Sequence, residues 1–238
     1  MLGDRPTPGA QVRPVLLEVV ILWLVTLLLI RGVVDLQAGA GLPDWVLATV
    51  PVLFIYAPVL WCRVRGVDSF AYGLAVPAFR EVGAWGQALL TSGKLMAWIL
   101  IPWLVGYHLY QTHLFGFEPS MRLPESLLTL VAYHTFFVAI PEEFFYRGYL
   151  QTRLNEVFER RFILFGIPFG HGLWIGSLLF AFGHSLVVVQ WWHFAIFFPG
   201  LLFGLLREKT GGVLAGAFFH AACNVMVHVL DTAYGVIP

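Results

Sequence analysis

The chain has 238 residues, of which 59% are hydrophobic and only 12% are charged. Soluble domains are about 45–50% apolar and about 25% charged, so this composition excludes an ordinary soluble domain and indicates a membrane protein. The formal net charge is zero, which gives no reason to expect a nucleic acid as a partner. The cysteines, Cys62 and Cys223, lie in apolar stretches and do not indicate a disulfide framework.

Apolar segments that could cross a membrane follow one another along the chain. A hydrocarbon core of about 30 Å requires about 20 apolar residues in a helix, and the alternation typical of a membrane β-barrel is absent. We therefore predict an all-α, polytopic transmembrane helix bundle with about seven spans. The predicted spans are Pro14–Ile30, Asp44–Trp61, Ala84–Tyr110, Pro124–Leu150, Gly172–Val189, Trp191–Leu206 and Gly212–Leu230. The stretch 162–171 is predicted to form a short interfacial or re-entrant piece.

Basic residues set the predicted orientation. With the N-terminus inside, almost all arginines and lysines outside the spans fall on inner segments, and the outer segments hold only Arg31 and Arg122. The positive-inside rule then predicts a cytoplasmic N-terminus and a C-terminus on the outer side.

Acidic residues inside the spans are concentrated at one place. An ionisable residue at membrane depth costs at least about 2.5–3.5 kcal/mol on insertion scales, so each one needs a reason. Residues 140–147 read Ile-Pro-Glu-Glu-Phe-Phe-Tyr-Arg. Glu143 and Arg147 are four residues apart and can pair along one helix face. Adjacent carboxylates point about 100° apart on a helix, so we predict that Glu142 points into the bundle interior. Pro141 removes one helical hydrogen bond and predicts a local bend.

Two later spans carry histidines in apolar surroundings. His184 follows Phe180 by four residues, and Asn224 follows His220 by four, on the same helix face. Taken alone, each histidine is more often a hydrogen-bonded packing residue than a catalyst. Counted from the predicted inner ends of their spans, however, Glu142, His184 and His220 all lie roughly 12–17 Å deep. Three helices are therefore predicted to bring a carboxylate and two imidazoles to one layer.

This combination of residues suits the hydrolysis of a peptide bond. A carboxylate and an imidazole around a water molecule can act as the general base and later return the proton to the leaving amine. A second imidazole and an Asn amide can donate hydrogen bonds to the developing oxyanion. The chemistry needs no cofactor, and none is predicted.

Three segments in this order resemble the motifs of the CPBP intramembrane peptidases. They are Glu-Glu-Phe-Phe-Tyr-Arg at 142–147, Phe180-x-x-x-His184 and His220-x-x-x-Asn224. The family includes the CAAX prenyl endopeptidases and bacterial relatives linked to bacteriocin processing or C-terminal sorting signals. The resemblance covers about residues 124–230, the C-terminal half of the chain.

The resemblance implies a glutamic-type intramembrane endopeptidase and a role for each motif residue. The implied water activators are Glu142 and His184, the oxyanion donors are His220 and Asn224, and the supporting residues are Glu143, Arg147 and Phe180. We accordingly predict three parts of the chain: a cytoplasmic tail at 1–13, N-terminal spans at 14–123 with a substrate or packing role, and a catalytic core at 124–238. The expected substrate is a membrane-tethered protein or peptide that is cut near one end.

Three other interpretations stay open. Glu142, His184 and His220 could bind Zn²⁺ with a water molecule as the fourth ligand, although the His-Glu-x-x-His pattern of helical zinc sites is absent. The same residues could form a proton relay or ligand pocket in a transporter, although we find no internal repeat. A catalytically silent relative that binds a membrane partner is the third interpretation.

The basic residues also hint at the source of the protein. All but two of the 14 basic residues, Lys94 and Lys209, are arginines, which is typical of GC-rich bacterial genomes. We therefore expect the protein in a bacterial inner (plasma) membrane. In a bacterium, a role in sorting-signal processing or maturation is favoured over the cleavage of a prenylated substrate. The sequence contains no indication of the oligomeric state.

Overall fold

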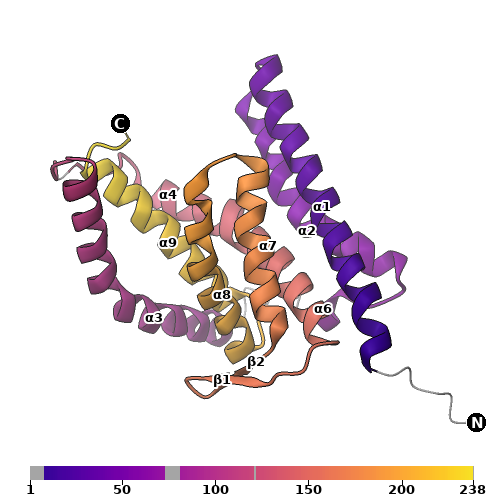
Figure 1. The fold of residues 1–238 in the computed structure, drawn as a ribbon. Helices are drawn as coiled ribbons and strands as arrows, with labels where there is room; N and C mark the ends of the chain where they lie inside the picture. The colour runs from indigo at the N-terminus through magenta and orange to yellow at the C-terminus, as the bar shows by residue number, and fades with distance from the viewer. Residues whose placement is uncertain (1–7, 73–80, 121, 238) are drawn as a thin grey trace, which may run out of the picture. The chain divides into compact units, whose positions relative to one another are not determined.

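The structure is a computed structural model that describes residues 8–72, 81–120 and 122–237. It is largely helical (Figure 1), as predicted for an all-α membrane bundle. Among the described residues, five helices are long and apolar enough to cross a membrane: Gln11–Ala40, Asp44–Val64, Val82–Leu114, Leu127–Asn155 and Leu214–Ala233. His171–Val187 is a shorter apolar helix. The count of seven spans and the orientation stay predictions.

The elements are labelled in chain order, with η for a 3-10 or π-helical segment. They are α1 Pro8–Ala40, η1 Asp44–Ala48, α2 Thr49–Val64, η2 Ser69–Tyr72, α3 Val82–Leu109, η3 Tyr110–Leu114, α4 Leu127–Tyr133, η4 His134–Ala139, α5 Ile140–Glu143, η5 Phe144–Gln151, α6 Thr152–Asn155, β1 Phe162–Leu164, β2 Ile167–Phe169, α7 His171–Val187, η6 Trp191–Ile196, α8 Phe197–Thr210 and α9 Leu214–Ala233.

The first helix is longer than the predicted span at both ends. It begins at Pro8, within the predicted tail, whose residues 1–7 lie outside the described part of the chain. At the other end it continues past Ile30 to Ala40, and Arg31 at the start of this extension has two partners. Arg31 Nε lies 2.6 Å from Asp35 Oδ2, one turn along the helix, and Arg31 Nη1 donates to the Val187 carbonyl at 3.2 Å.

The fourth predicted span is one continuous helix whose hydrogen-bond pattern changes around Pro141. Proline has no amide hydrogen to donate to the preceding turn. The π-helical segment η4 precedes it, and a second π-helical segment, η5, follows Glu143. Such segments inside α-helices are rare and frequently coincide with functional sites.

The piece predicted at 162–171 contains a β-hairpin. β1 and β2 pair antiparallel, with Phe162 opposite Phe169 and Leu164 opposite Ile167. The two residues between the strands, Phe165 and Gly166, have φ values of 51° and 76°. Positive φ at both positions is what a tight two-residue hairpin turn requires.

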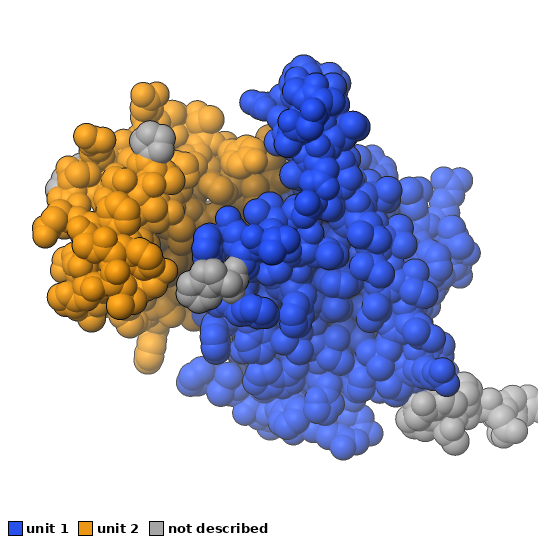
Figure 2. Space-filling model, turned by 45° about the horizontal axis from the view of Figure 1, so that its top comes forward, with its two compact units in different colours: residues 1–76, 141–213 blue, residues 77–140, 214–238 orange. Residues whose placement is uncertain are grey.

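The chain divides into two units, which Figure 2 colours separately. Unit 1 comprises residues 1–76 and 141–213, and unit 2 comprises residues 77–140 and 214–238. Within unit 1, α1 packs against α2 and α7, and α7 packs against α8 and η5. Within unit 2, α9 packs against α3, α4 and η4. The predicted functional division at residue 124 stays a prediction.

Glycines allow the helices of unit 1 to approach one another closely. A Cβ atom at Gly204 of α8 would lie 2.3 Å from Leu173 Cδ1 and 2.7 Å from Gln151 Oε1. A Cβ atom at Gly183 of α7 would lie 2.4 Å from the Tyr146 hydroxyl oxygen. Small residues at such contacts are the usual basis of close helix packing in membranes. The two glycines therefore help to set the position of α7.

A carboxylate near the start of α1 joins several elements of unit 1. Glu18 accepts hydrogen bonds from Tyr149 Oη at 2.6 Å, Trp61 Nε1 at 3.1 Å and Arg153 Nη2 at 2.9 Å. Arg65 Nη1 lies 3.3 Å from the same carboxylate. Only 12% of the Glu18 side chain is exposed. We name these five residues the Glu18 network; it fastens α1 to α2, η5 and α6.

The change Glu18→Gln is expected to lower the free energy of unfolding by about 1–3 kcal/mol, because Arg65 and Arg153 would lose their shared carboxylate. Thermal unfolding of the purified protein in detergent measures this loss. Glu159→Gln is the matched control, since Glu159 and Arg161 form an exposed ion pair at 2.9 Å and such pairs contribute little. Equal unfolding temperatures for the two variants would contradict the prediction.

Candidate active site

Glu142 of α5 and His184 of α7 lie side by side in unit 1. Glu142 Oε2 is 3.9 Å from His184 Nε2, and the two side chains are 15% and 29% exposed. This separation is too long for a direct hydrogen bond, but a water molecule beside the pair can contact both atoms. The two residues that the sequence predicted at one depth on different spans are therefore neighbours in the structure.

The position of the proton on His184 follows from its second nitrogen. Nδ1 lies 2.8 Å from the backbone oxygen of Phe180, one turn earlier in α7. A carbonyl oxygen only accepts hydrogen bonds, so the neutral ring must carry its proton on Nδ1. Nε2 then presents its lone pair on the side of Glu142, where it can accept a hydrogen bond or a proton from water.

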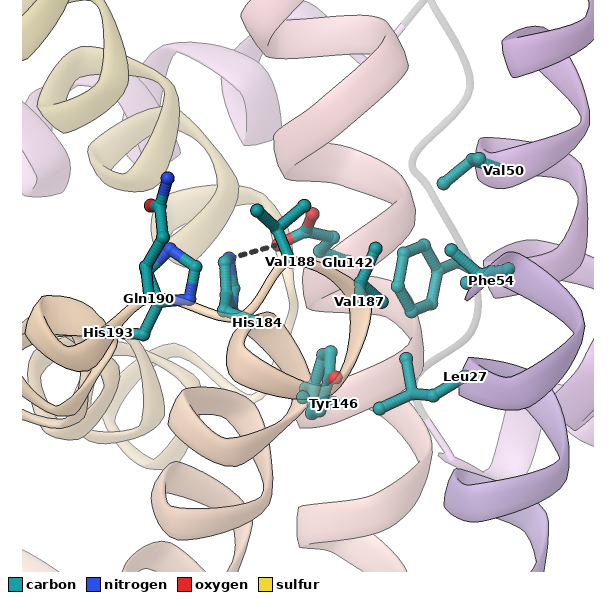
Figure 3. Close-up of a pocket in the computed structure, with 12 residues that line it drawn as sticks. Leu27, Val50, Phe54, Glu142, Tyr146, His184, Val187, Val188, Gln190 and His193 are labelled. Carbon is teal, nitrogen blue, oxygen red and sulfur yellow. Dashed lines mark ion pairs between the residues drawn. The ribbon is translucent and has the colours of Figure 1, made fainter. Parts of the chain in front are cut away.

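The pair lines a cavity of about 270 Å³ in unit 1 (Figure 3). Its lining divides into hydrogen-bonding and apolar side chains. The hydrogen-bonding side chains are those of Glu142, Tyr146, His184, Gln190 and His193, and apolar side chains from α1 and α2 are those of Leu27, Ile30, Val50 and Phe54. The N-terminal spans, which contain no recognisable motif, thus build part of the wall around the candidate site.

The predicted pair of Glu143 and Arg147 is present and buried. Arg147 Nη1 donates to Glu143 Oε1 at 2.9 Å, and neither side chain is more than 1% exposed. Arg147 Nη2 donates to the Gly200 carbonyl of α8 at 3.0 Å. The guanidinium carbon lies 4.2 Å from the ring centre of Phe180, which packs edge-on against the ring of His184. The ion pair therefore holds η5 against α7 and α8 beside the candidate site, and Phe180 packs against both the guanidinium and the His184 ring.

The other two predicted residues, His220 and Asn224, belong to α9 in unit 2. His220 is buried, with 4% exposure, and Asn224 is half-buried one turn further along. The structure thus brings Glu142 together with His184 in unit 1, and it places His220 and Asn224 one turn apart in unit 2. That all four residues form one site stays a prediction.

His193 is a pocket residue that the sequence analysis missed. Its position near a predicted span end was explained by the membrane interface. In the structure its ring centre lies 5.8 Å from that of His184. The sequence does contain a signal for this proximity, because only Gln190 separates the predicted spans Gly172–Val189 and Trp191–Leu206. Such a short connection forces the chain to reverse tightly and returns its first residues to the end of the preceding helix.

The zinc interpretation requires three protein side chains close enough to share one metal ion. Within the described ranges, no group of three or more His, Cys, Asp or Glu side chains is arranged to hold a metal ion. The zinc interpretation needs His220 beside Glu142 and His184, and it stays a hypothesis for experiment.

The buried ion pair gives a stability prediction. Glu143→Gln is expected to lower the free energy of unfolding by about 3–5 kcal/mol, because it leaves the Arg147 guanidinium buried without its counter-charge. Chemical or thermal unfolding in detergent measures this change. Glu118→Gln is the control, because Glu118 is exposed in the connection after η3. If Glu143→Gln unfolded at the wild-type temperature, the ion pair would not have the structural role argued here.

Comparison with known proteins bears on the C-terminal half of the chain. Residues 124–226 match the family model described as Type II CAAX prenyl endopeptidase Rce1-like. No curated protein and no solved structure matches the chain. The matched stretch contains all three motifs, so the resemblance inferred from them is confirmed. Residues 124–226 of this integral membrane protein are therefore similar to the Rce1-like type II CAAX prenyl endopeptidases.

Proposed function

We propose that the protein is an intramembrane endopeptidase that hydrolyses a peptide bond in a membrane-tethered protein or peptide. The observation that carries the proposal is the geometry of one pair. The Glu142 carboxylate and the lone pair on His184 Nε2 face one another across 3.9 Å in a cavity between apolar helices. The family match supports a protease at the family level.

In the proposed reaction the pair activates a water molecule. The water donates hydrogen bonds to Glu142 Oε2 and His184 Nε2, which leaves an oxygen lone pair for the scissile carbonyl carbon. As the oxygen–carbon bond forms, the Glu142–His184 pair takes the proton from the water. The same pair returns a proton to the amine nitrogen as the carbon–nitrogen bond breaks. Hydrolysis therefore needs no other acid or base.

His220 and Asn224 are the proposed donors to the oxyanion of the tetrahedral intermediate. They are one turn apart on α9, so an imidazole N–H and an amide N–H can point to the same oxygen. Donors fixed in a low-dielectric site stabilise developing charge strongly, and removal of one such donor typically costs about 10²–10³ in rate.

The surroundings of the pair favour a tethered substrate. Glu142 lies within the helix Leu127–Asn155, which is long and apolar enough to span the membrane, so the scissile bond must reach below the membrane surface. A lipid group or a transmembrane segment would hold a peptide at that depth. Maturation of a C-terminal sorting signal or of a lipid-modified tail fits this requirement. The arginine-rich basic residues favour a bacterial inner membrane as the location.

The first test compares wild type with Glu142→Gln in liposomes. The substrates are two sets of peptides, one ending in a prenylated CAAX sequence and one tethered by a transmembrane helix, with cleavage followed by mass spectrometry. Glutamine keeps the shape of glutamate but cannot act as a base, so we expect a loss of about 10²–10⁴ in rate. Glu125→Gln, which changes an exposed carboxylate before α4, should cleave at the wild-type rate.

Either of two results would count against this function. Equal cleavage by wild type and Glu142→Gln would remove Glu142 from the mechanism. Folded wild-type protein that cleaves neither set of peptides would favour a binding or transport role.

A second test separates the water mechanism from the zinc interpretation. Because the proposed reaction uses only side chains, activity should survive prolonged treatment with EDTA or 1,10-phenanthroline followed by removal of the chelator. Metal content by mass spectrometry and activity are measured on the same sample. Activity that disappears on chelation and returns with added Zn²⁺ would replace the proposed mechanism with a metal-dependent one.

A further inference from the structure

The segment that follows α7 brings a second imidazole to the candidate site. α7 ends at Val187, and Val188 and Gln190 have extended backbone conformations before η6 begins. This reversal places the His193 ring 5.8 Å from the His184 ring, at an angle of 73°. Figure 3 shows His193 and Glu142 on opposite sides of His184, and all three residues line the same cavity.

The two histidines differ in how the protein holds them. His184 donates through Nδ1 to the Phe180 carbonyl. The His193 ring interacts with the backbone at His184 and Val188, but its buried Nδ1 forms no hydrogen bond of normal geometry within the described residues. A buried polar atom without a partner costs folding stability, and native structures contain few of them. The fold therefore satisfies the His193 ring less well than the His184 ring, whose Nδ1 lies 2.8 Å from the Phe180 carbonyl oxygen.

A peptide bound in this cavity would need polar partners. Its backbone N–H and C=O groups would leave water for a pocket whose opposite wall is formed by apolar residues of α1 and α2. Backbone groups left without partners in such surroundings are costly. Glu142 and His184 are occupied by the reacting water in the proposed function. The polar side chains of Gln190 and His193 are then available beside the scissile bond.

We propose that His193 is a further positioning residue of the site, which hydrogen-bonds the backbone of the substrate peptide next to the scissile bond. The proposal rests on the proposed function. A neutral imidazole offers one N–H donor and one lone pair, so it can serve a peptide N–H or C=O. The apolar wall would receive the adjoining side chain, while His193 holds the main chain.

The test measures substrate binding separately from cleavage. His193→Phe keeps an aromatic ring against His184 but removes both nitrogens, whereas His193→Gln removes the ring but keeps a donor and an acceptor. Each change is made in the Glu142→Gln protein, so that binding can be measured without turnover. The probes are fluorescent versions of the prenylated and the helix-tethered peptides defined above, in liposomes. His113→Phe, at an exposed histidine of η3, is the matched control.

We expect His193→Phe to weaken binding of the better-bound probe about tenfold, which is the effect of one lost hydrogen bond. His193→Gln should retain most of the parent protein's affinity for the same probe. In the enzyme that retains Glu142, His193→Phe should raise KM more than it lowers kcat. The unfolding temperature of His193→Phe should stay close to that of the parent, because the aromatic ring is kept and Nδ1 loses no hydrogen bond of normal geometry. The control should match the parent protein in all three measurements.

A packing role for His193 predicts the opposite order of the variants. His193→Phe would then bind the probe like the parent, and His193→Gln would be the impaired and less stable protein; that result would overturn the proposal. Failure of the proposed function is visible separately, as absence of cleavage by wild type. Weaker probe binding by His193→Phe would still support His193 as a contact of the bound peptide.

Discussion

The ion pair between Glu143 and Arg147 supports the geometry of the whole candidate site. Two charges with at most 1% exposure are tolerable only because each is matched within the protein. Arg147 also holds the Gly200 carbonyl and lies over the ring of Phe180. The carbonyl of that same Phe180 fixes the proton on His184. A continuous set of contacts thus leads from a purely structural pair to the protonation of a candidate catalytic residue.

The interior of unit 1 contains two polar regions and a row of packed aromatic side chains. The Glu18 network lies at one end, where it joins α1, α2, η5 and α6, and the cavity with Glu142 lies further along the same helices. The buried rings of Phe145, Tyr146, Phe180 and Phe203 pack against one another in the same unit. The three phenylalanine rings fill space without adding polar groups, and Tyr146 also lines the cavity. The Glu18 network and the lining of the cavity have no residue in common.

Local spacing was enough to predict the parts of the site that lie within one helix or at one depth. The four-residue interval predicted the Glu143–Arg147 pair, and counting from span ends predicted that Glu142 and His184 would lie at one level. Contacts between helices far apart in sequence were not predictable in this way. The packing of Val50 and Phe54 around the cavity depends on how α2 crosses its neighbours, which one sequence does not encode locally. The hairpin turn was missed because Phe165 adopts a positive φ that its side chain does not favour.

Gly183 has a consequence for any attempt to redesign the accepted peptide. It precedes His184, and a Cβ atom there would meet the Tyr146 hydroxyl at 2.4 Å and Leu27 Cδ1 at 3.0 Å. A larger residue would therefore push α7 away from η5 and carry His184 away from Glu142. The shape of the cavity cannot be altered at this position without altering the reactive pair. Engineering of the pocket has to start on α2, where Val50 and Phe54 border the cavity and neither residue holds His184 in place.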